Sequence, residues 1–285
     1  MTSYRELYDW GSHILESAGV PEYTLDARLL LEEACGTDRS TLLAHPDRPV
    51  TDEEEKRFRE WIDLRSERIP LQHLVGYQEF MGLRFCVSPD VLIPRQDTEI
   101  LVEEALRRFH DGMRVLDLCC GSGCILISLM QYSNDLLGVG ADLSEAALDI
   151  ARKNGEKLLG TEKSQALTWC RGDLFDAVSG SFDMILSNPP YIAETVREEL
   201  MPEVRDHDPD MALFGGEDGL DFYRRIAADA KTYLKPGGVM ILEIGCDQAK
   251  QVTDLLDAAG YTEIETIRDY AGLDRVICAR RPILF

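Results

Sequence analysis

The sequence Val115-Leu116-Asp117-Leu118-Cys119-Cys120-Gly121-Ser122-Gly123 joins an apolar run to a short turn that contains two glycines. Residues 125–129, which are apolar except for Ser128, then open a helix. A strand, a glycine turn and a helix in this order predict the first strand-to-helix turn of a doubly wound α/β sheet, where nucleotides bind. Glycine is needed at such a turn because a Cβ atom blocks the close approach of a ligand to the backbone. The stretch therefore predicts the fold class, although a G-x-G pattern alone says little about the ligand.

Two acidic residues farther along the chain indicate an adenosine ligand. Asp142 ends the next apolar run and lies 19 residues beyond Gly123, close to the spacing of about 20 at which an acid accepts the ribose hydroxyls. Asp142 also suits the N-terminus of a helix, which is the structural alternative. Asp173 follows the third apolar run, where its carboxylate can accept from the adenine amino group while Leu174 packs on the ring.

The ligand that best fits this pattern is S-adenosylmethionine. A nicotinamide dinucleotide needs a third small residue for close helix packing, and Leu126 occupies that position. S-adenosylmethionine has no phosphate, and we expect its ammonium group near Asp117. We expect this cofactor, with S-adenosylhomocysteine as its product and with no metal, to be bound by Asp117, Cys119, Cys120, Gly121, Ser122, Gly123, Asp142, Leu143, Asp173, Leu174 and Asn188.

The loop Ser187-Asn188-Pro189-Pro190-Tyr191 follows the fourth apolar run, so we expect it at the carboxyl edge of the sheet beside the cofactor. Its adjacent prolines make it extended and rigid. An amide or exocyclic amino nitrogen is a poor nucleophile because its lone pair is delocalised. The side-chain oxygen of Asn188 and the carbonyl of Pro189 can accept hydrogen bonds from such an NH₂ group and direct it at a methyl group.

Tyr191 can stack on the planar group that carries this nitrogen. A generic Asn-Pro-Pro turn is the structural alternative, but its place after the fourth run, downstream of the glycine turn and Asp142, favours catalysis. The sequence thus predicts methyl transfer to a planar nitrogen, with Asn188, Pro189, Pro190 and Tyr191 as the catalytic residues.

Three domains or segments are predicted. Residues 1–75 have helical patterns and no good strand, which indicates a small all-helical domain. Residues 76–94 alternate and contain Gly and Pro, which predicts a β-hairpin linker. In residues 95–285, helical patterns alternate with seven short runs rich in Val, Ile and Leu. They predict a Rossmann-like methyltransferase domain with a mostly parallel sheet, whose last two strands form an antiparallel pair.

Local signals place the helices of the first domain. Ser3 with Glu6, and Thr51 with Glu54, fit capping boxes at helix starts. Gly36 is expected to end the second helix. The helix that begins near Thr51 has a predicted apolar stripe made of Phe58, Trp61, Ile62 and Leu64.

The composition limits the substrates and partners that we expect for this chain. The chain has 285 residues, with 30 Lys and Arg against 52 Asp and Glu, for a net charge of −22. Such acidity repels phosphate backbones, so duplex DNA is not an expected substrate. No apolar run reaches the roughly 18 to 20 residues that span a bilayer, and the N-terminus does not resemble a signal peptide. The eight cysteines form no C-x-x-C pair, which favours buried free thiols. We expect a cytoplasmic, monomeric protein that binds no membrane.

The chain resembles the HemK/PrmC family of protein-(glutamine-N5) methyltransferases over nearly its whole length. The matching motifs are residues 92–99, the glycine turn, residues 187–191, residues 212–220, residues 234–238, and residues 243–245 with Gln248. The resemblance implies a seven-stranded class I methyltransferase domain, and a substrate glutamine in the Gly-Gly-Gln motif of class 1 peptide chain release factors.

The resemblance assigns Asn188, Pro189 and Tyr191 to the substrate glutamine, and Gly121, Gly123, Asp142 and Leu174 to the cofactor. Arg95 and Thr98 belong to a matching motif and are further substrate-site candidates, with a surface salt bridge as the alternative for Arg95. The chain departs from the family pattern at Cys119, which stands where the first glycine is usual, and at Leu174, where an aromatic residue can stand. These departures bear on cofactor affinity.

Three alternatives remain open from the sequence. A ribosomal-protein glutamine methyltransferase has a similar glycine turn. An adenine-N6 nucleic-acid methyltransferase uses a similar loop, but it should have a basic groove, whereas residues 1–75 are mixed to acidic. A non-enzymatic scaffold would leave the Asn188 loop unused.

Overall fold

The computed structural model describes residues 2–283, which divide into two compact units. Unit 1 contains the described residues up to Gly76 together with Met201–His207. Unit 2 contains Tyr77–Leu200 and the described residues from Asp208 onward. No helix within residues 2–283 is long and apolar enough to cross a membrane.

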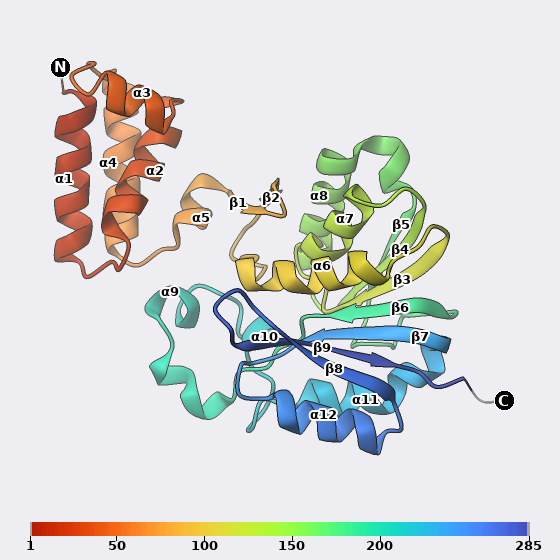
Figure 1. The fold of residues 1–285 in the computed structure, drawn as a ribbon. Coiled ribbons are helices and arrows are strands. Elements are labelled where there is room, and N and C mark those ends of the chain that lie inside the picture. The colour runs from red at the N-terminus through yellow and green to blue at the C-terminus, as the bar shows by residue number, and fades with distance from the viewer. Residues whose placement is uncertain (1, 284–285) are drawn as a thin grey trace. The chain divides into compact units, whose positions relative to one another are not determined.

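Unit 1 is a helical bundle in which α1, α2 and α4 lie side by side (Figure 1). Both predicted capping boxes form, at Ser3 with Glu6 and at Thr51 with Glu54. Gly36 ends α2 in the left-handed conformation, as predicted. The helices of this unit are α1 (Tyr4–Ser17), α2 (Tyr23–Cys35), α3 (Arg39–Ala44), α4 (Asp52–Ser66), α5 (Leu71–Val75) and α9 (Pro202–Arg205).

The core of unit 1 lies between these helices, where Phe58 and Ile62 are fully buried. A Cβ added at Gly11 would lie 2.7 Å from the Phe58 ring, so glycine lets α1 approach α4 closely. The prediction that Leu64 belongs to the apolar stripe of α4 is wrong, because its side chain is 39% exposed. Leu64 follows Ile62 by two residues, and that spacing turns it toward the opposite face of a helix.

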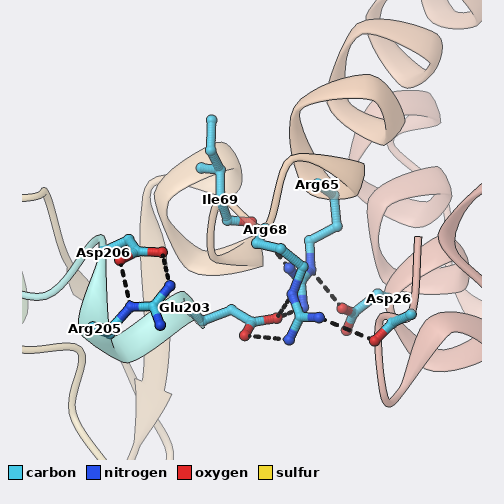
Figure 2. Close-up of polar contacts among 8 residues, drawn as sticks. Asp26, Arg65, Arg68, Ile69, Glu203, Arg205 and Asp206 are labelled. Atoms are coloured by element: carbon cyan, nitrogen blue, oxygen red, sulfur yellow. Dashed lines mark hydrogen bonds and ion pairs between the residues drawn. The ribbon is translucent and has the colours of Figure 1, made fainter. Parts of the chain in front are cut away.

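A cluster of ion pairs ties α9 to the rest of unit 1 (Figure 2). Arg65 is nearly buried and donates to Asp26 at 2.7 Å and to Glu203 at 2.8 Å. Arg68 binds the same Glu203 carboxylate through two nitrogens, at 2.8 and 2.6 Å. Burial opposes ionisation of Glu203, but hydrogen bonds from Arg68 and Arg65 lower its pKa to about 2. The cluster thus joins segments that lie far apart in the sequence.

Unit 2 is built on a seven-stranded sheet with the strand order β5-β4-β3-β6-β7-β9-β8. Neighbouring strands from β5 to β7 run parallel, and β9 is antiparallel to both β7 and β8. The mostly parallel sheet and its antiparallel last pair are as predicted. The strands are β3 (Met113–Leu118), β4 (Leu136–Asp142), β5 (Leu167–Arg171), β6 (Phe182–Ser187), β7 (Leu234–Glu243), β8 (Thr262–Arg268) and β9 (Asp274–Arg280).

Helices cover both faces of this sheet, with α6, α7 and α8 on one side and α11 and α12 on the other (Figure 1). The central strands are therefore buried on both faces, which explains their continuous apolar runs. The helical segments of unit 2 are η1 (Gln96–Thr98), α6 (Glu99–Arg108), α7 (Cys124–Gln131), α8 (Glu145–Ser164), η2 (Glu194–Glu199), α10 (Asp210–Leu213), α11 (Asp221–Tyr233) and α12 (Ala249–Ala258).

The predicted hairpin forms within unit 2 as β1 (Tyr77–Phe80) and β2 (Leu83–Cys86), and residues 87–94 form no strand. The hairpin packs on the unit's core through buried Phe80 and Phe85. The side chain of Asn154 in α8 accepts from the Cys86 amide at 2.7 Å and donates to the Cys86 carbonyl at 3.1 Å. These contacts fix the hairpin beside the glycine turn, because the same amide group donates to the carbonyl of Ser122.

Candidate active site

The glycine turn between β3 and α7 has a backbone conformation that favours glycine. Gly121 and Gly123 both have left-handed φ angles, of 51° and 76°. A Cβ at Gly123 would lie 2.9 Å from Trp169 and from Ile127, so only glycine fits there. A Cβ at Gly121 would meet no atom within 4 Å and would project into the open space that Gly121 lines. This turn therefore leaves room for a ligand against the backbone.

Asp142 ends β4 and points its carboxylate at the same turn. One oxygen accepts from the Gly121 amide at 2.8 Å, and the other accepts from the Ser144 amide at 2.9 Å. Burial raises the pKa of this carboxyl, and the hydrogen bonds to it oppose that rise. Two amides fix the carboxylate, while each oxygen keeps a second lone pair for an outside donor such as a ribose hydroxyl. The N-cap of α8 is Ser144, so Asp142 is not itself the capping residue.

A cleft opens at the carboxyl edge of the sheet between this turn and the loop after β6. Leu118 and Ser187 are paired at the ends of β3 and β6, so the two turns leave the sheet side by side. The hollow has a volume of about 90 Å³. The predicted site residues that line it are Cys119, Gly121, Asp142, Leu143, Asp173, Leu174, Asn188 and Pro190.

The remaining predicted cofactor residues do not line the cleft. Cys120, Ser122 and Gly123 are buried in the turn. Asp117 is also fully buried, and neither of its carboxylate oxygens has a hydrogen-bond partner among the described residues. Burial, and next the charge of Asp142, raise the pKa of Asp117 well above its usual range, while the Leu126 amide acts against the rise. A buried carboxylate without a partner is costly, and a cationic group bound at the turn would satisfy it.

Two residues that line the cleft have strained backbones. Cys119 has a φ of 57° and Leu174 a φ of 51°, in the left-handed region that favours glycine. These are the two positions at which the chain departs from the family pattern. The strain is therefore located in the walls of the cleft, as is common at functional sites.

Asp173 already has a partner in this structure. Its carboxylate forms an ion pair with Arg225 at 2.9 Å, and its side chain is 41% exposed. A carboxylate has about four acceptor positions, so the ion pair leaves Asp173 able to accept from an amino group in the cleft.

The predicted catalytic loop is anchored at several points. Asn188 donates through its side-chain nitrogen to the Thr98 hydroxyl at 3.3 Å. The Tyr191 hydroxyl donates to Glu243 at 3.3 Å, and the Tyr191 carbonyl accepts from the side chain of Gln248 at 2.9 Å. Burial, and next the charge of Glu243, raise the pKa of the Tyr191 hydroxyl well above its usual range. The loop is consequently fixed at both ends before any substrate arrives.

The two substrate-site candidates lie outside the lining of the cleft. Thr98 is buried against the Asn188 side chain. Arg95 donates to Asp208 at 2.5 Å, and the Asp208 side chain is 1% exposed whereas that of Arg95 is 43% exposed. The Asp208 carboxylate is therefore buried, whereas the Arg95 side chain reaches the surface. Arg95 keeps donors that face solvent.

Sequence reasoning did not select Glu243 as a site residue, although it lies 1% exposed beneath the catalytic loop. Its signal was a carboxylate at the end of the apolar run 239–242, where burial demands a reason. Gln248 belongs to a matching family motif but was not assigned to the site, and Arg275 was not singled out. Arg275 forms ion pairs with Asp97 at 3.2 Å and Asp269 at 3.1 Å, and the pairing with Asp97, which is distant in sequence, leaves no local pattern.

Comparisons with known proteins identify the family of both units. The PrmC N-terminal domain model matches residues 6–76, and the methyltransferase small domain model matches residues 95–204. A methyltransferase structure from Pyrococcus furiosus superposes with a TM-score of 0.53 at 20% identity, over 71% of this chain and 90% of that one, which supports the fold.

Two curated relatives match over almost their full length. The release factor glutamine methyltransferase of Geobacter sulfurreducens is 42% identical, over 97% of this chain and 96% of its own. That of Agrobacterium fabrum is 38% identical, over 94% of this chain and 93% of its own. Identity at this level over both units shows common descent of the whole chain, so it belongs to the HemK/PrmC family and is a protein-glutamine methyltransferase.

Proposed function

We propose that this enzyme transfers the methyl group of S-adenosylmethionine to the side-chain amide N5 of the glutamine in the Gly-Gly-Gln motif of class 1 peptide chain release factors. The observation that carries the proposal is that Asn188 and Pro190 line the same cleft as Gly121 and Asp142. A candidate amide-binding loop and a candidate adenosine-binding turn thus line the same cleft. The relatives from Geobacter and Agrobacterium, named release factor glutamine methyltransferases, support the choice of substrate.

The residues of the cleft fit the cofactor. Asp142 is fixed by two amides and can accept from the ribose hydroxyls. Gly121 leaves space for the ligand at the backbone, and the unpartnered Asp117 carboxylate suits the ammonium group. Leu174 lines the wall on which an adenine ring would pack. S-adenosylmethionine bound here would supply a methyl group on a positively charged sulfur, and S-adenosylhomocysteine would be the leaving group when the substrate nitrogen takes that methyl group.

The loop prepares the nitrogen for this step. The Asn188 side-chain oxygen and the Pro189 carbonyl each accept a hydrogen bond from one N–H group of the substrate amide. These two contacts hold the NH₂ group in one orientation. Tyr191 packs on the planar amide. The nitrogen loses a proton only after the methyl group has been transferred, so the site needs no strong base to start the reaction.

We also propose that the helical domain, residues 1–75, docks the protein substrate. A single glutamine side chain offers little contact area for choosing one protein among many. A second contact surface outside the cleft supplies that selectivity.

The test uses the full-length enzyme with a class 1 release factor and S-adenosylmethionine. Tandem mass spectrometry of the tryptic Gly-Gly-Gln peptide should show the mass of one added methylene on the glutamine. If the cofactor binds but this peptide stays unmodified, the release-factor assignment is wrong. Methylation of a ribosomal-protein glutamine or of a nucleic-acid adenine in parallel reactions would then identify the acceptor.

A further inference from the structure

A buried carboxylate lies beneath the catalytic loop without an assigned role. Glu243 ends β7 and is 1% exposed, and its backbone carbonyl accepts from the Tyr223 hydroxyl at 2.8 Å. The carboxylate accepts from Tyr191 at 3.3 Å, and apart from Tyr191 and Thr98 it has no hydrogen-bond partner among the described residues. Burying an ionisable group in this way destabilises the fold, so a functional reason for its presence is expected.

Thr98 connects this carboxylate to Asn188. Its side chain is buried and its oxygen accepts from the Asn188 side-chain nitrogen at 3.3 Å. A hydrogen bond from the same Thr98 side chain lowers the pKa of the Glu243 carboxyl. Thr98 is the last residue of η1 and the N-cap of α6, and Asn188 lies 90 residues farther along the chain. The contact therefore depends on the fold and not on local sequence.

The donors and acceptors of these three side chains can be arranged in one consistent way. An ionised carboxylate accepts only, so the single Thr98 proton points at Glu243. The Thr98 oxygen is then an acceptor, and it selects the NH₂ end of the Asn188 amide. The Asn188 carbonyl oxygen is left as the free end, which is the end that a substrate NH₂ group requires.

We propose that Glu243 and Thr98 are positioning residues that set the orientation of the Asn188 amide and, through the Tyr191 hydroxyl, the position of the catalytic loop. The inference deepens the proposed function, because it assumes that Asn188 accepts from the substrate amide. Reversal of the Asn188 amide would place a donor against the donor of the substrate and would remove one of its two fixing contacts.

The arrangement predicts a pH dependence of the transfer step. Burial raises the pKa of Glu243 to about 7, while Thr98, Arg275 and Tyr191 lower it and Asp97 raises it. Protonated Glu243 becomes a donor and no longer holds the Thr98 proton in place. The kcat should therefore fall as the pH drops through about 7.

A matched pair of Thr98 variants tests the proposal on the full-length enzyme, with release factor as substrate. Thr98→Val keeps the shape but removes the hydroxyl, and Thr98→Ser keeps the hydroxyl. Because loss of orientation at a reacting group costs up to about a hundredfold in rate, we expect Thr98→Val to lower kcat by about ten- to a hundredfold. Thr98→Ser should stay within about threefold of wild type, and S-adenosylmethionine affinity should be unchanged in both.

Glu243→Gln provides the second measurement, because it is neutral at every pH. Its kcat should be reduced and should lose the inflection near pH 7. Equal kcat values for Thr98→Val and Thr98→Ser, or an unchanged pH profile in Glu243→Gln, would overturn the proposal while wild type remains active. Failure of wild type to methylate the release factor would instead overturn the proposed function. Should Thr98→Val not fold, the pH profile of Glu243→Gln decides alone.

Discussion

At the scale of single residues, the left-handed backbone conformation of Cys119 leads to a testable prediction. Its φ of 57° is costly for any residue with a Cβ. We predict that Cys119→Gly raises the free energy of unfolding by about 1 kcal/mol and leaves S-adenosylmethionine affinity equal or higher, because the side chain lines the cleft. Thermal unfolding and calorimetric titration measure the two effects.

Cys120 is the matched control for that substitution, since it is buried and its φ is not positive. Cys120→Gly should lower the free energy of unfolding, through loss of packing and of backbone restriction. Stabilisation by both substitutions, or by neither, would show that the strain at Cys119 does not affect stability.

Asn188 and Asp142 line one cleft, but their substitution should affect different properties of the enzyme. We predict that Asn188→Ala lowers kcat by about a hundred- to a thousandfold, with little change in cofactor affinity. Removal of one preorganised hydrogen-bonding group from the active sites of other enzymes has an effect of this size. Asp142→Ala should instead weaken S-adenosylmethionine binding, because it removes the proposed ribose acceptor and frees the Gly121 amide. Steady-state kinetics and direct binding measurements separate them. Parallel losses of kcat and affinity in both variants would contradict these separate roles.

At the scale of elements, the loop after β6 depends on the start of α12. The side chain of Gln248 donates to the Tyr191 carbonyl at 2.9 Å and accepts from the Gly245 amide at 2.9 Å. We predict that Gln248→Ala costs about 1–3 kcal/mol of unfolding free energy, because it leaves buried backbone groups without partners. It should also lower kcat, since the loop loses an anchor. Urea unfolding and turnover measurements should both respond.

The neighbouring Gln251 in α12 is exposed and offers a control of the same residue type. Gln251→Ala should change neither unfolding nor turnover. If Gln248→Ala destabilises the protein but leaves kcat intact, the anchor contributes only to stability.

How far the sequence predicts these elements depends on how local their signals are. The two capping boxes, the β1–β2 hairpin and the order of strands and helices follow from patterns within a few residues, and the structure confirms them. Asp142 could be singled out because its spacing from the glycine turn is a local property. The partners of Glu243 could not, because Thr98 and Tyr191 reach it from distant segments. Leu64 was mispredicted because apolar character alone does not specify which side of a helix is buried.

At the scale of the whole molecule, the Arg65 cluster makes α9 part of the helical unit although its sequence lies inside residues 95–285. We predict that Glu203→Gln lowers the free energy of unfolding by about 1–3 kcal/mol at neutral pH, because it removes charge-assisted hydrogen bonds. Urea unfolding followed by the fluorescence of Trp10 and Trp61, which pack on the core of unit 1, measures the loss.

The pH dependence of that loss has a definite sign. The pKa of Glu203 is lowered from its ordinary value of 4.5 to about 2, so its contribution is complete above pH 4.5 and disappears as the pH falls toward 2. The difference between wild type and Glu203→Gln should shrink over that interval. Glu199→Gln, at an exposed site, should match wild type throughout. A difference that stays constant with pH would exclude ionisation of Glu203 as its cause.

The position of α9 in the chain also affects the order in which a newly made molecule can fold. Arg65 and Glu203 are separated by 138 residues, which a ribosome takes on the order of ten seconds to add at about 5–20 residues per second. During that interval the emerging helical bundle holds a guanidinium group whose second carboxylate has not yet been synthesised. The first unit to leave the ribosome is thus among the last to be completed, and nascent chains arrested before Glu203 should be more sensitive to protease in the bundle than chains arrested after it.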